Sequence, residues 1–281
     1  MKKLLSFLLV AVMAIGLFTG CGKKEAEEKK TDEQKTEATG NETEEVTFTV
    51  GFDAEFPPYG YRDESGEYVG FDLDLAAEVA TRNGWKLVKQ PIDWDAKDME
   101  LSSGAIDCIW NGFTINTRED EYTWSQPYVD NSQVVVVASD SGIKTKADLA
   151  GKVVAVQKDS SALAALNDEK NKENIALRDS FKQLIEYADY NTAFMDLEQG
   201  AVEAVAIDIG VAQYQIEKRE AGAYVMLDEK LATEQYGVGF KLGNTELRDK
   251  VQKTLDEMVK DGTFMKIAEE WGLTDSVCLG K

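Results

Sequence analysis

The stretch QVVVVASDSGIKTKADLAGKVVAVQ, residues 133–157, contains two strongly apolar segments separated by a polar region. The first segment, 133–139, is a near-continuous apolar run, which is typical of a strand covered on both faces. The second segment, 152–157, has the same character and begins a new series of strand and helix signals. The stretch therefore predicts a join between two α/β modules near residues 137–142.

Strand and helix signals alternate on both sides of this join. Repeated strand–helix units predict mostly parallel sheets covered by helices, here in two lobes connected near residues 137–142 and 232–237. We expect lobe 1 to comprise residues 46–137 and 237–281, and lobe 2 to comprise residues 138–236. The expected strands are 46–52, 85–90, 105–110, 133–139, 152–157, 201–207 and 236–242, and the expected helices are 70–84, 96–104, 160–166, 190–200, 209–222, 245–262 and 263–272.

The composition excludes several classes of function. The chain has 281 residues, a formal net charge of −21 and no histidine. Its acidity argues against nucleic-acid binding, which rests on neutralising phosphates with lysine and arginine. Without histidine, Ser-His-Asp hydrolysis, Cys-His hydrolysis and histidine-based zinc sites are impossible. Carboxylates, lysine, tyrosine, cysteine or a cofactor could still carry a reaction, so the enzyme class is weakened but stays open.

The N-terminal stretch MKKLLSFLLVAVMAIGLFTGC has a positive start, an apolar run and small residues before Cys21, as a secretory signal does. Its end, LFTGC, resembles a bacterial lipobox, whose cysteine is lipidated; an uncleaved anchor and a plainly secreted protein are the alternatives. We expect a signal peptide at 1–20 and a lipidated disordered tether at 21–45, because this tether contains few apolar side chains. The protein is then anchored at the extracellular face of the cell membrane, or is periplasmic where the source has an outer membrane. The remaining cysteines, Cys108 and Cys278, either form a disulfide or stay free thiols.

Polar and aromatic side chains stand where the expected strands end. Ligands of open α/β sheets bind beyond the carboxyl ends of the strands, where the N–H groups of following helices point outward. Several of these side chains also have simpler explanations, since Asp and Ser at such joins are commonly helix caps. The side chains at these ends are Asp53, Phe56, Trp94, Asn111, Thr114, Arg118, Ser160, Ser161 and Asp208.

Arg118 is unusual among them. Asn116, followed three residues later by Glu119, has the pattern of a capping box and predicts a helix that starts there. Arg118 would then lie in the first turn, where the helix dipole disfavours a cation by roughly 0.3–1 kcal/mol. An anionic partner would offset this cost, so the position indicates an anion-binding arginine.

Together these side chains match the needs of an amino acid. Its carboxylate requires a guanidinium and helix N-terminal N–H groups, which Arg118 and the start of the Ser161 helix would provide. Its ammonium group requires a carboxylate and neutral acceptors, and Asp208 and the Thr114 hydroxyl fit. Asp53 would face the ligand side chain, while aromatic residues would exclude water and strengthen the polar contacts.

The motifs GFDAEFPPYGY, GFDLDLAAEVA, NGFTINTRED, WSQPY, DLAGKVVAVQ, AVAIDIGVA and EQYGVGFKLGNTELRDKV occur in this order and cover essentially the whole chain after residue 46. They resemble the solute-binding proteins of polar amino acid ABC transporters, the bacterial extracellular solute-binding proteins of family 3. The resemblance implies a two-lobed periplasmic-binding-protein (Venus-flytrap) fold with two crossover strands. It also implies an amino acid held in the cleft and delivered to a transporter permease.

The resemblance also assigns site residues. The sequence departs from the family pattern in two places: the loop 114–118 is one residue shorter than usual, and Trp110-Asn111 stands where small residues are more typical. In the first lobe, Asp53 and Phe56 match the motif that reads the ligand side chain, and Trp94 matches an aromatic residue that covers the ligand. The loop that binds the backbone of the ligand is matched by Asn111, Gly112, Thr114 and Arg118. In the second lobe, Gln157 matches a position that varies with the ligand, Ser160 and Ser161 match the start of a helix, and Asp208 matches the acid that holds the α-amino group.

Two alternatives to transport stay open at this point. A cleft dehydratase of the same fold, acting on a prephenate-like acid, would use Glu55 as its acid or base. A ligand sensor that docks on a membrane receptor would suit the lipobox and tether equally well. We expect a monomer that binds a small molecule and a permease, with no cofactor, no metal and no nucleic acid. Acidic residues near the expected pocket mouth, including Asp93 and Asp95, favour a cationic or amide side chain in the ligand.

Overall fold

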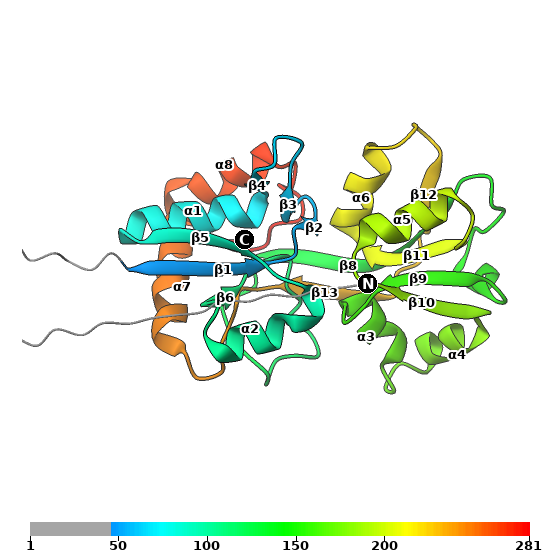
Figure 1. Ribbon diagram of the computed structural model, residues 1–281, viewed down its shortest axis with the longest axis horizontal. Coiled ribbons are helices and arrows are strands. Elements are labelled where there is room, and N and C mark those ends of the chain that lie inside the picture. The colour runs from blue at the N-terminus through cyan, green and yellow to red at the C-terminus, as the bar shows by residue number, and fades with distance from the viewer. Residues whose placement is uncertain (1–45) are drawn as a thin grey trace, which may run out of the picture. The chain divides into compact units, whose positions relative to one another are not determined.

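The computed structural model describes residues 46–281, so the expected signal peptide, the tether and Cys21 lie outside the described residues. The described residues belong to one compact unit. They form two larger β-sheets with helices packed on them, and a small three-stranded sheet (Figure 1). The predicted two-lobed α/β fold is therefore confirmed.

The first lobe is built on a five-stranded sheet in the order β5-β1-β6-β14-β7. Strand β1 pairs in parallel with β5 and β6, so the carboxyl ends of these strands meet at one edge. Helix α1 buries Leu73, Ala76 and Val79 and ends at Gly84, which has the left-handed conformation expected there. The elements are β1 (Thr47–Phe52), β5 (Lys86–Pro91), β6 (Cys108–Ile109), β7 (Thr123–Trp124), β14 (Gly239–Phe240), α1 (Phe71–Asn83), η1 (Trp94–Ala96) and α2 (Lys97–Ser103).

A small sheet of three strands follows β1 and was not predicted. Its strands are two or three residues long, which is too short for a periodic pattern to be recognised. Gly70 joins this sheet to α1 so closely that a Cβ atom there would lie 2.2 Å from the Tyr59 carbonyl oxygen, at a φ of 146°. The strands are β2 (Glu55–Phe56), β3 (Gly60–Arg62) and β4 (Tyr68–Val69).

The second lobe is built on a six-stranded sheet in the order β10-β9-β11-β8-β12, with β13 added on β8. Strand β9 pairs in parallel with β10 and β11. The sequence analysis missed α4 and β10, whose segment carries mixed polar residues without a clear apolar period. The elements are β8 (Val129–Ala138), η2 (Lys146–Leu149), β9 (Val153–Gln157), α3 (Ser161–Asn167), α4 (Lys172–Ser180), β10 (Gln183–Tyr187), α5 (Tyr190–Glu198), β11 (Ala204–Asp208), α6 (Ile209–Glu217), β12 (Tyr224–Met226) and β13 (Ala232–Tyr236).

Two antiparallel strands connect the lobes. Strand β8 pairs with β11 and β12 in the second sheet, and its first half pairs with β13, from Val129 opposite Tyr236 to Gln133 opposite Ala232. Strand β14 follows β13 in the chain and belongs to the first sheet. The two crossover strands are thus present, whereas the residues assigned to each lobe stay a prediction.

The sheets are mixed, so the prediction of mostly parallel sheets needs correction. The reason is that the crossing strands run in opposite directions: β8 enters the second lobe and β13 returns from it. The returning strand leads into β14, which is antiparallel to both β6 and β7. Strands that cross between the lobes in opposite directions form antiparallel pairs. Strands within one lobe that are connected through a helix form the parallel pairs.

The two C-terminal helices pack against the first helix of the first lobe. They are α7 (Thr245–Asp261) and α8 (Thr263–Glu270). Arg82 at the end of α1 donates to Asp261 at 2.7 Å and to Thr263 at 2.9 Å, which joins α1 to the turn between the helices. Cys108 is buried, Cys278 is partly buried, and both are free thiols in the structure.

We predict that Leu255→Ala in α7 lowers the free energy of unfolding by about 2–5 kcal/mol, because it leaves a cavity under a fully buried leucine. Chemical denaturation measures this change. The control in the same helix is Lys253→Ala, whose side chain is 79% exposed and which we expect to change stability by less than about 0.5 kcal/mol. Equal effects of the two substitutions would contradict the packing of α7 described here.

Candidate functional site

A small cavity brings predicted residues of both lobes together. Every residue that lines it belongs to the predicted set. The lining residues follow the carboxyl ends of strands in both sheets, as expected for a ligand site in α/β folds. They are Phe56, Trp94, Asn111, Gly112, Gln157, Ser160, Ser161 and Asp208.

The three remaining predicted residues lie directly behind this lining. The Asp53 carboxylate accepts a hydrogen bond from Gln157 Nε2 at 2.7 Å. The Arg118 guanidinium donates to Ser161 Oγ at 3.2 Å. Thr114 is buried and its hydroxyl donates to Glu234, a residue that the sequence analysis did not select. The structure therefore brings all the predicted residues to one place, and their role in binding a ligand stays a prediction.

The turn after β6 forms the first-lobe wall. Gly112 has a φ of 58°, and a Cβ atom there would lie 2.9 Å from the Phe56 ring, so the turn requires glycine. Its N–H donates to Asp72 Oδ2 at 2.6 Å, and Asn111 Oδ1 accepts from the Asp53 N–H at 3.0 Å. The Asn111 amide nitrogen is buried without a partner among the described residues.

Arg118 does not lie in a helix, so that prediction is wrong. Residues 115–121 form turns, with Thr117 at a φ of 70°, and the Asn116 side chain accepts from the Gln235 N–H instead of capping a helix. The guanidinium is buried and extends toward the second lobe, where it donates to the Asp159 carbonyl oxygen at 3.3 Å. Contacts across the lobes, rather than a helix dipole, position this cation.

The second-lobe wall begins at α3. Ser160 caps this helix through a hydrogen bond from the Leu163 N–H at 3.2 Å, as predicted. Gln157 at the end of β9 donates both to Asp53 and to the Ala188 carbonyl oxygen. Burial raises the pKa of Asp53 to about 6, although hydrogen bonds from the Glu55 N–H and Gln157 lower it in part. Asp53 is therefore a carboxylate that lacks a cationic partner in residues 46–281.

Asp208 occupies the N-cap position of α6, but its side chain makes no cap hydrogen bond. Instead, its Oδ1 accepts from Asn131 at 2.8 Å, from Gln133 at 2.6 Å and from the Tyr236 hydroxyl at 2.6 Å. Burial and the neighbouring Glu234 carboxylate raise the pKa of Asp208. The side chain is thus held toward the crossover strands and the cavity rather than used as a cap.

Comparison with known proteins identifies the family. The model of the bacterial extracellular solute-binding proteins, family 3, matches residues 48–274. The chain belongs to this family. The L-cystine-binding protein TcyJ of Escherichia coli strain K12 is 29% identical over 267 residues, covering 94% of each protein. The arginine-binding extracellular protein ArtP of Bacillus subtilis strain 168 is 28% identical over 276 residues, covering 96% of this chain and 98% of that protein.

Solved structures agree with this assignment. An ABC uptake transporter substrate-binding protein from Streptococcus pneumoniae with bound histidine is 35% identical, with a TM-score of 0.76 over 80% of this chain and 92% of that one. An ancestral arginine-binding protein bound to arginine is 37% identical, with a TM-score of 0.72 over 80% and 97% of the two chains. The predicted family is confirmed, and its members compared here are binding proteins rather than enzymes.

This solute-binding protein has four polar site neighbours that the sequence analysis missed: Asn131, Gln133, Glu234 and Tyr236. All lie on the crossover strands, where the pairing sets Asn131 opposite Glu234 and Gln133 opposite Asp208. A signal for them does exist. Polar runs stand at 130–133 in β8 and at 233–235 in β13, and residues two positions apart in a strand, such as Asn131 and Gln133, share one face.

The loop after β9 joins the lobes beside the cavity of the solute-binding protein. Lys158 pairs with Asp95, and the Asp159 carboxylate pairs with Lys97, whose side chain is buried. The indole nitrogen of Trp94 donates to the Asp159 carbonyl oxygen at 3.2 Å. These contacts hold Trp94 at the cavity that it lines, and its role as a cover over the ligand stays a prediction.

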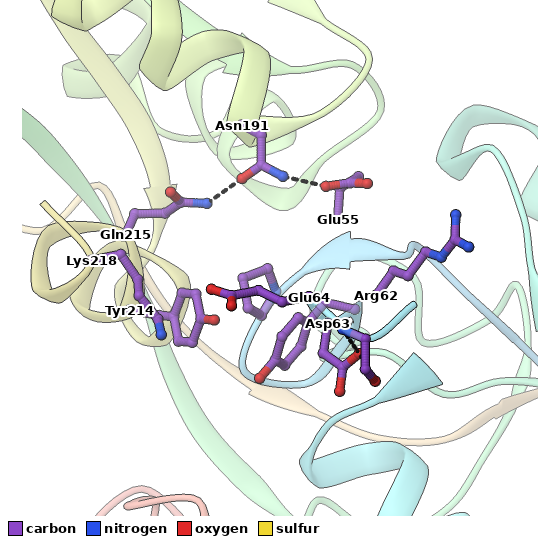
Figure 2. A pocket seen from close by; sticks show the side chains of 11 residues that line it. Glu55, Arg62, Asp63, Glu64, Asn191, Tyr214, Gln215 and Lys218 are labelled. Atoms are coloured by element: carbon purple, nitrogen blue, oxygen red, sulfur yellow. Dashed lines mark hydrogen bonds between the residues drawn. The ribbon is translucent and has the colours of Figure 1, made fainter. Parts of the chain in front are cut away.

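A larger pocket of about 1100 Å³ lies between the β2–β3 hairpin and helices α5 and α6 (Figure 2). None of the predicted ligand residues lines it. Figure 2 shows Asn191 between Gln215 and Glu55, to which it is hydrogen-bonded on both sides. Glu55, the acid of the dehydratase alternative, therefore bonds a neutral amide here and lies outside the small cavity.

Residues 46–281 contain no group of three His, Cys, Asp or Glu side chains placed to hold a metal ion. In the same range, none of the helices combines the length and the apolar character needed to cross a bilayer.

We predict that Asp53 makes the folded state less stable as pH rises. Its folded pKa of about 6 exceeds the ordinary value of 3.8, so between these values the folded protein binds more protons and loses stability with increasing pH. Asp53→Asn removes this pH-dependent contribution to the free energy of unfolding, which is about 2–3 kcal/mol for a pKa shift of this size. Urea unfolding of both proteins from pH 4 to pH 7 measures it.

The control for the loss of one negative charge is Asp140→Asn at an exposed position. We expect the free-energy difference between Asp140→Asn and the unchanged protein to be nearly independent of pH over this range. If the profile of Asp53→Asn runs parallel to that of the unchanged protein, the burial effect on Asp53 is refuted.

Proposed function

We propose that the protein captures a polar amino acid in the cavity between its lobes and delivers it to an ABC transporter permease. The observation that carries this proposal is the placement of opposite charges at one cavity. Arg118 from the first lobe bonds Ser161, which lines the cavity, and Asp208 from the second lobe lines it directly. A zwitterion needs both charges, so one ligand would link the two lobes.

The ligand carboxylate would bind Arg118 and the polar groups of Ser160 and Ser161. Arg118 donates to the Ser161 hydroxyl at present, and a carboxylate is a stronger acceptor for the same N–H group. The ligand ammonium would bind the second oxygen of Asp208, since all three hydrogen bonds to this carboxylate go to Oδ1. A ligand that contacts both lobes binds the closed form more tightly than the open form. It stabilises the closed form by this difference in binding free energy.

The ligand side chain would extend toward Asp53 and Gln157. An acidic pocket of about 1120 Å³ continues from this side, bordered by Trp94 and by the carboxylates Asp93 and Asp95. Its charge favours a cationic or amide side chain. Relatives named for cystine, arginine and glutamine span this range of polar ligands.

A thermal-shift screen of the twenty amino acids with cystine and ornithine tests the proposal. A ligand present at 100 times its Kd raises the free energy of unfolding by about 2.7 kcal/mol, because it binds only the folded state. We expect one group of polar amino acids to raise the melting temperature. A flat response to the whole set would refute amino acid capture.

We predict that Arg118→Ala weakens amino acid binding by about 2 kcal/mol or more, because it removes a charge-assisted pair inside a closed cavity. Isothermal titration calorimetry with the amino acid that gives the largest thermal shift measures this loss. The control is Arg178→Ala on α4, whose guanidinium bonds Asn167 and Asp179 rather than residues of the cavity. Unchanged affinity of Arg118→Ala, with a normal melting temperature, would remove Arg118 from the site.

We also propose that a lipid on Cys21 anchors the protein to the extracellular face of the membrane, where it acts as a monomer. The LFTGC motif supports the anchor, and both halves of the cavity come from one chain, which supports a monomer. Cys21→Ala should release the protein from the membrane fraction of the expressing cells, with unchanged ligand binding. Retention of Cys21→Ala in that fraction would contradict the lipid anchor.

A further inference from the structure

The carboxylates of Asp208 and Glu234 are joined by two amide groups. Asn131 Nδ2 donates to Asp208 at 2.8 Å and to Glu234 at 2.7 Å. Gln133 Nε2 donates to the same two oxygens at 2.6 Å and 2.7 Å. Because each nitrogen bonds both acids, Asp208 Oδ1 and Glu234 Oε1 lie close together in a buried place.

The hydrogen bonds to this pair are unevenly distributed. Tyr236 adds a third donor to Asp208 Oδ1, and the Thr114 hydroxyl adds a third to Glu234 Oε1. The other oxygen of each acid, Oδ2 and Oε2, receives no hydrogen bond from residues 46–281. Each acid thus has one saturated oxygen and one that can hold a proton or accept from a ligand.

The surroundings contribute little positive charge. Within the described chain, no lysine or arginine bonds either carboxylate. The Arg118 guanidinium donates to the Thr114 carbonyl oxygen at 3.5 Å, to Ser161 and to Asp159 instead. The N-terminus of α6 adds a partial positive charge at Asp208. The other ionisable groups facing the pair are the hydroxyls of Tyr59, Tyr190 and Tyr236, and Asp72 on α1 bonds Gly112 and Tyr128 instead.

Two adjacent buried carboxylates without a cation resist simultaneous ionisation, because their repulsion adds to the cost of removing both from water. A single proton on the pair relieves the repulsion, and so does a bound cation. We propose that Asp208 and Glu234 share one proton in the ligand-free protein and that the ammonium group of the amino acid displaces this proton into solvent. The inference rests on the proposed function and deepens it by adding Glu234 to the ammonium subsite as a positioning residue.

The displaced proton has a route to solvent that the ligand does not block. Glu234 also lines a separate pocket of about 550 Å³, together with Asn116, Thr117 and residues of α3 and α4. Asp208 lines the ligand cavity, and the two pockets share Ser161. The pair therefore separates the ligand cavity from a second pocket, so a proton can leave through Glu234 while the amino acid occupies the cavity. The exchange is balanced: one ammonium charge enters the subsite and one proton leaves it.

The first arm of the test uses the ligand-free protein. Infrared spectra near pH 6 report the C=O stretch of protonated carboxyl groups. We expect Glu234→Gln to lose the intensity of one protonated carboxyl relative to the unchanged protein, and Asp208→Asn to lose the same band. The control is Glu257→Gln on the exposed face of α7, which should leave the band intact. An unchanged band in Glu234→Gln would overturn the shared proton.

The second arm uses L-arginine, L-glutamine and L-cystine as probes. Titration calorimetry in phosphate and in Tris buffer, whose ionisation enthalpies differ, counts the protons released on binding. We expect about one proton per ligand near pH 6 and an affinity that falls about tenfold per pH unit in more acidic solution. Glu234→Gln should release about one proton fewer per ligand than the unchanged protein and show a flatter pH profile, and Glu257→Gln should behave like the unchanged protein.

The two arms distinguish failure of this inference from failure of the proposed function. Binding of a probe without proton release overturns the shared proton and leaves amino acid capture intact. If none of the probes binds, capture of these amino acids fails, and the infrared comparison alone decides the shared proton.

Discussion

The antiparallel pairing of β8 with β13 is the constraint on which the rest of the structure depends. It takes the chain from the first sheet into the second and back, so that β14, α7 and α8 complete the lobe in which the chain began. The same register sets Asn131 opposite Glu234 and brings Tyr236 beside Thr114. The connection between the lobes is therefore also part of the candidate site, and a change in its register would move polar side chains to the other face.

Groups of opposite charge stand at the cavity. Arg118 bonds Ser161 at the start of α3, and Asp208, which lines the cavity, is joined to Glu234 by shared amide donors. Aromatic residues enclose the space between them, with Phe56 and Trp94 on its walls. In such surroundings an unpaired charge is costly and a paired one is strong, so a zwitterion satisfies both ends at once. In our proposal, Glu234 adds a second carboxylate beside Asp208, and the proton that the two acids share leaves when a cationic group binds.

Much of the fold and most of the cavity lining were accessible from the sequence, for an identifiable reason. Helix α1 carries an apolar period and the valine-rich β8 a near-continuous apolar run, and side chains that follow parallel strands meet at one sheet edge. The short strands β2, β3 and β4 carry too few residues for a period, and the polar helix α4 has a weak one. Arg118 was found at the right place for the wrong reason, because turn contacts and partners in the second lobe hold it rather than a helix.

The sequence by itself determined the repeated strand–helix units and the residues at the strand ends, since both follow from local periodicity and from the geometry of parallel strands. Only the tertiary structure decided which strands pair in antiparallel fashion, that Asp208 turns away from its helix, and that Glu234 lies beside it. Contacts between residues 208 and 234, or between 118 and 161, depend on register and closure across the whole chain. No local pattern encodes them, because each requires two distant segments to be brought together by packing elsewhere.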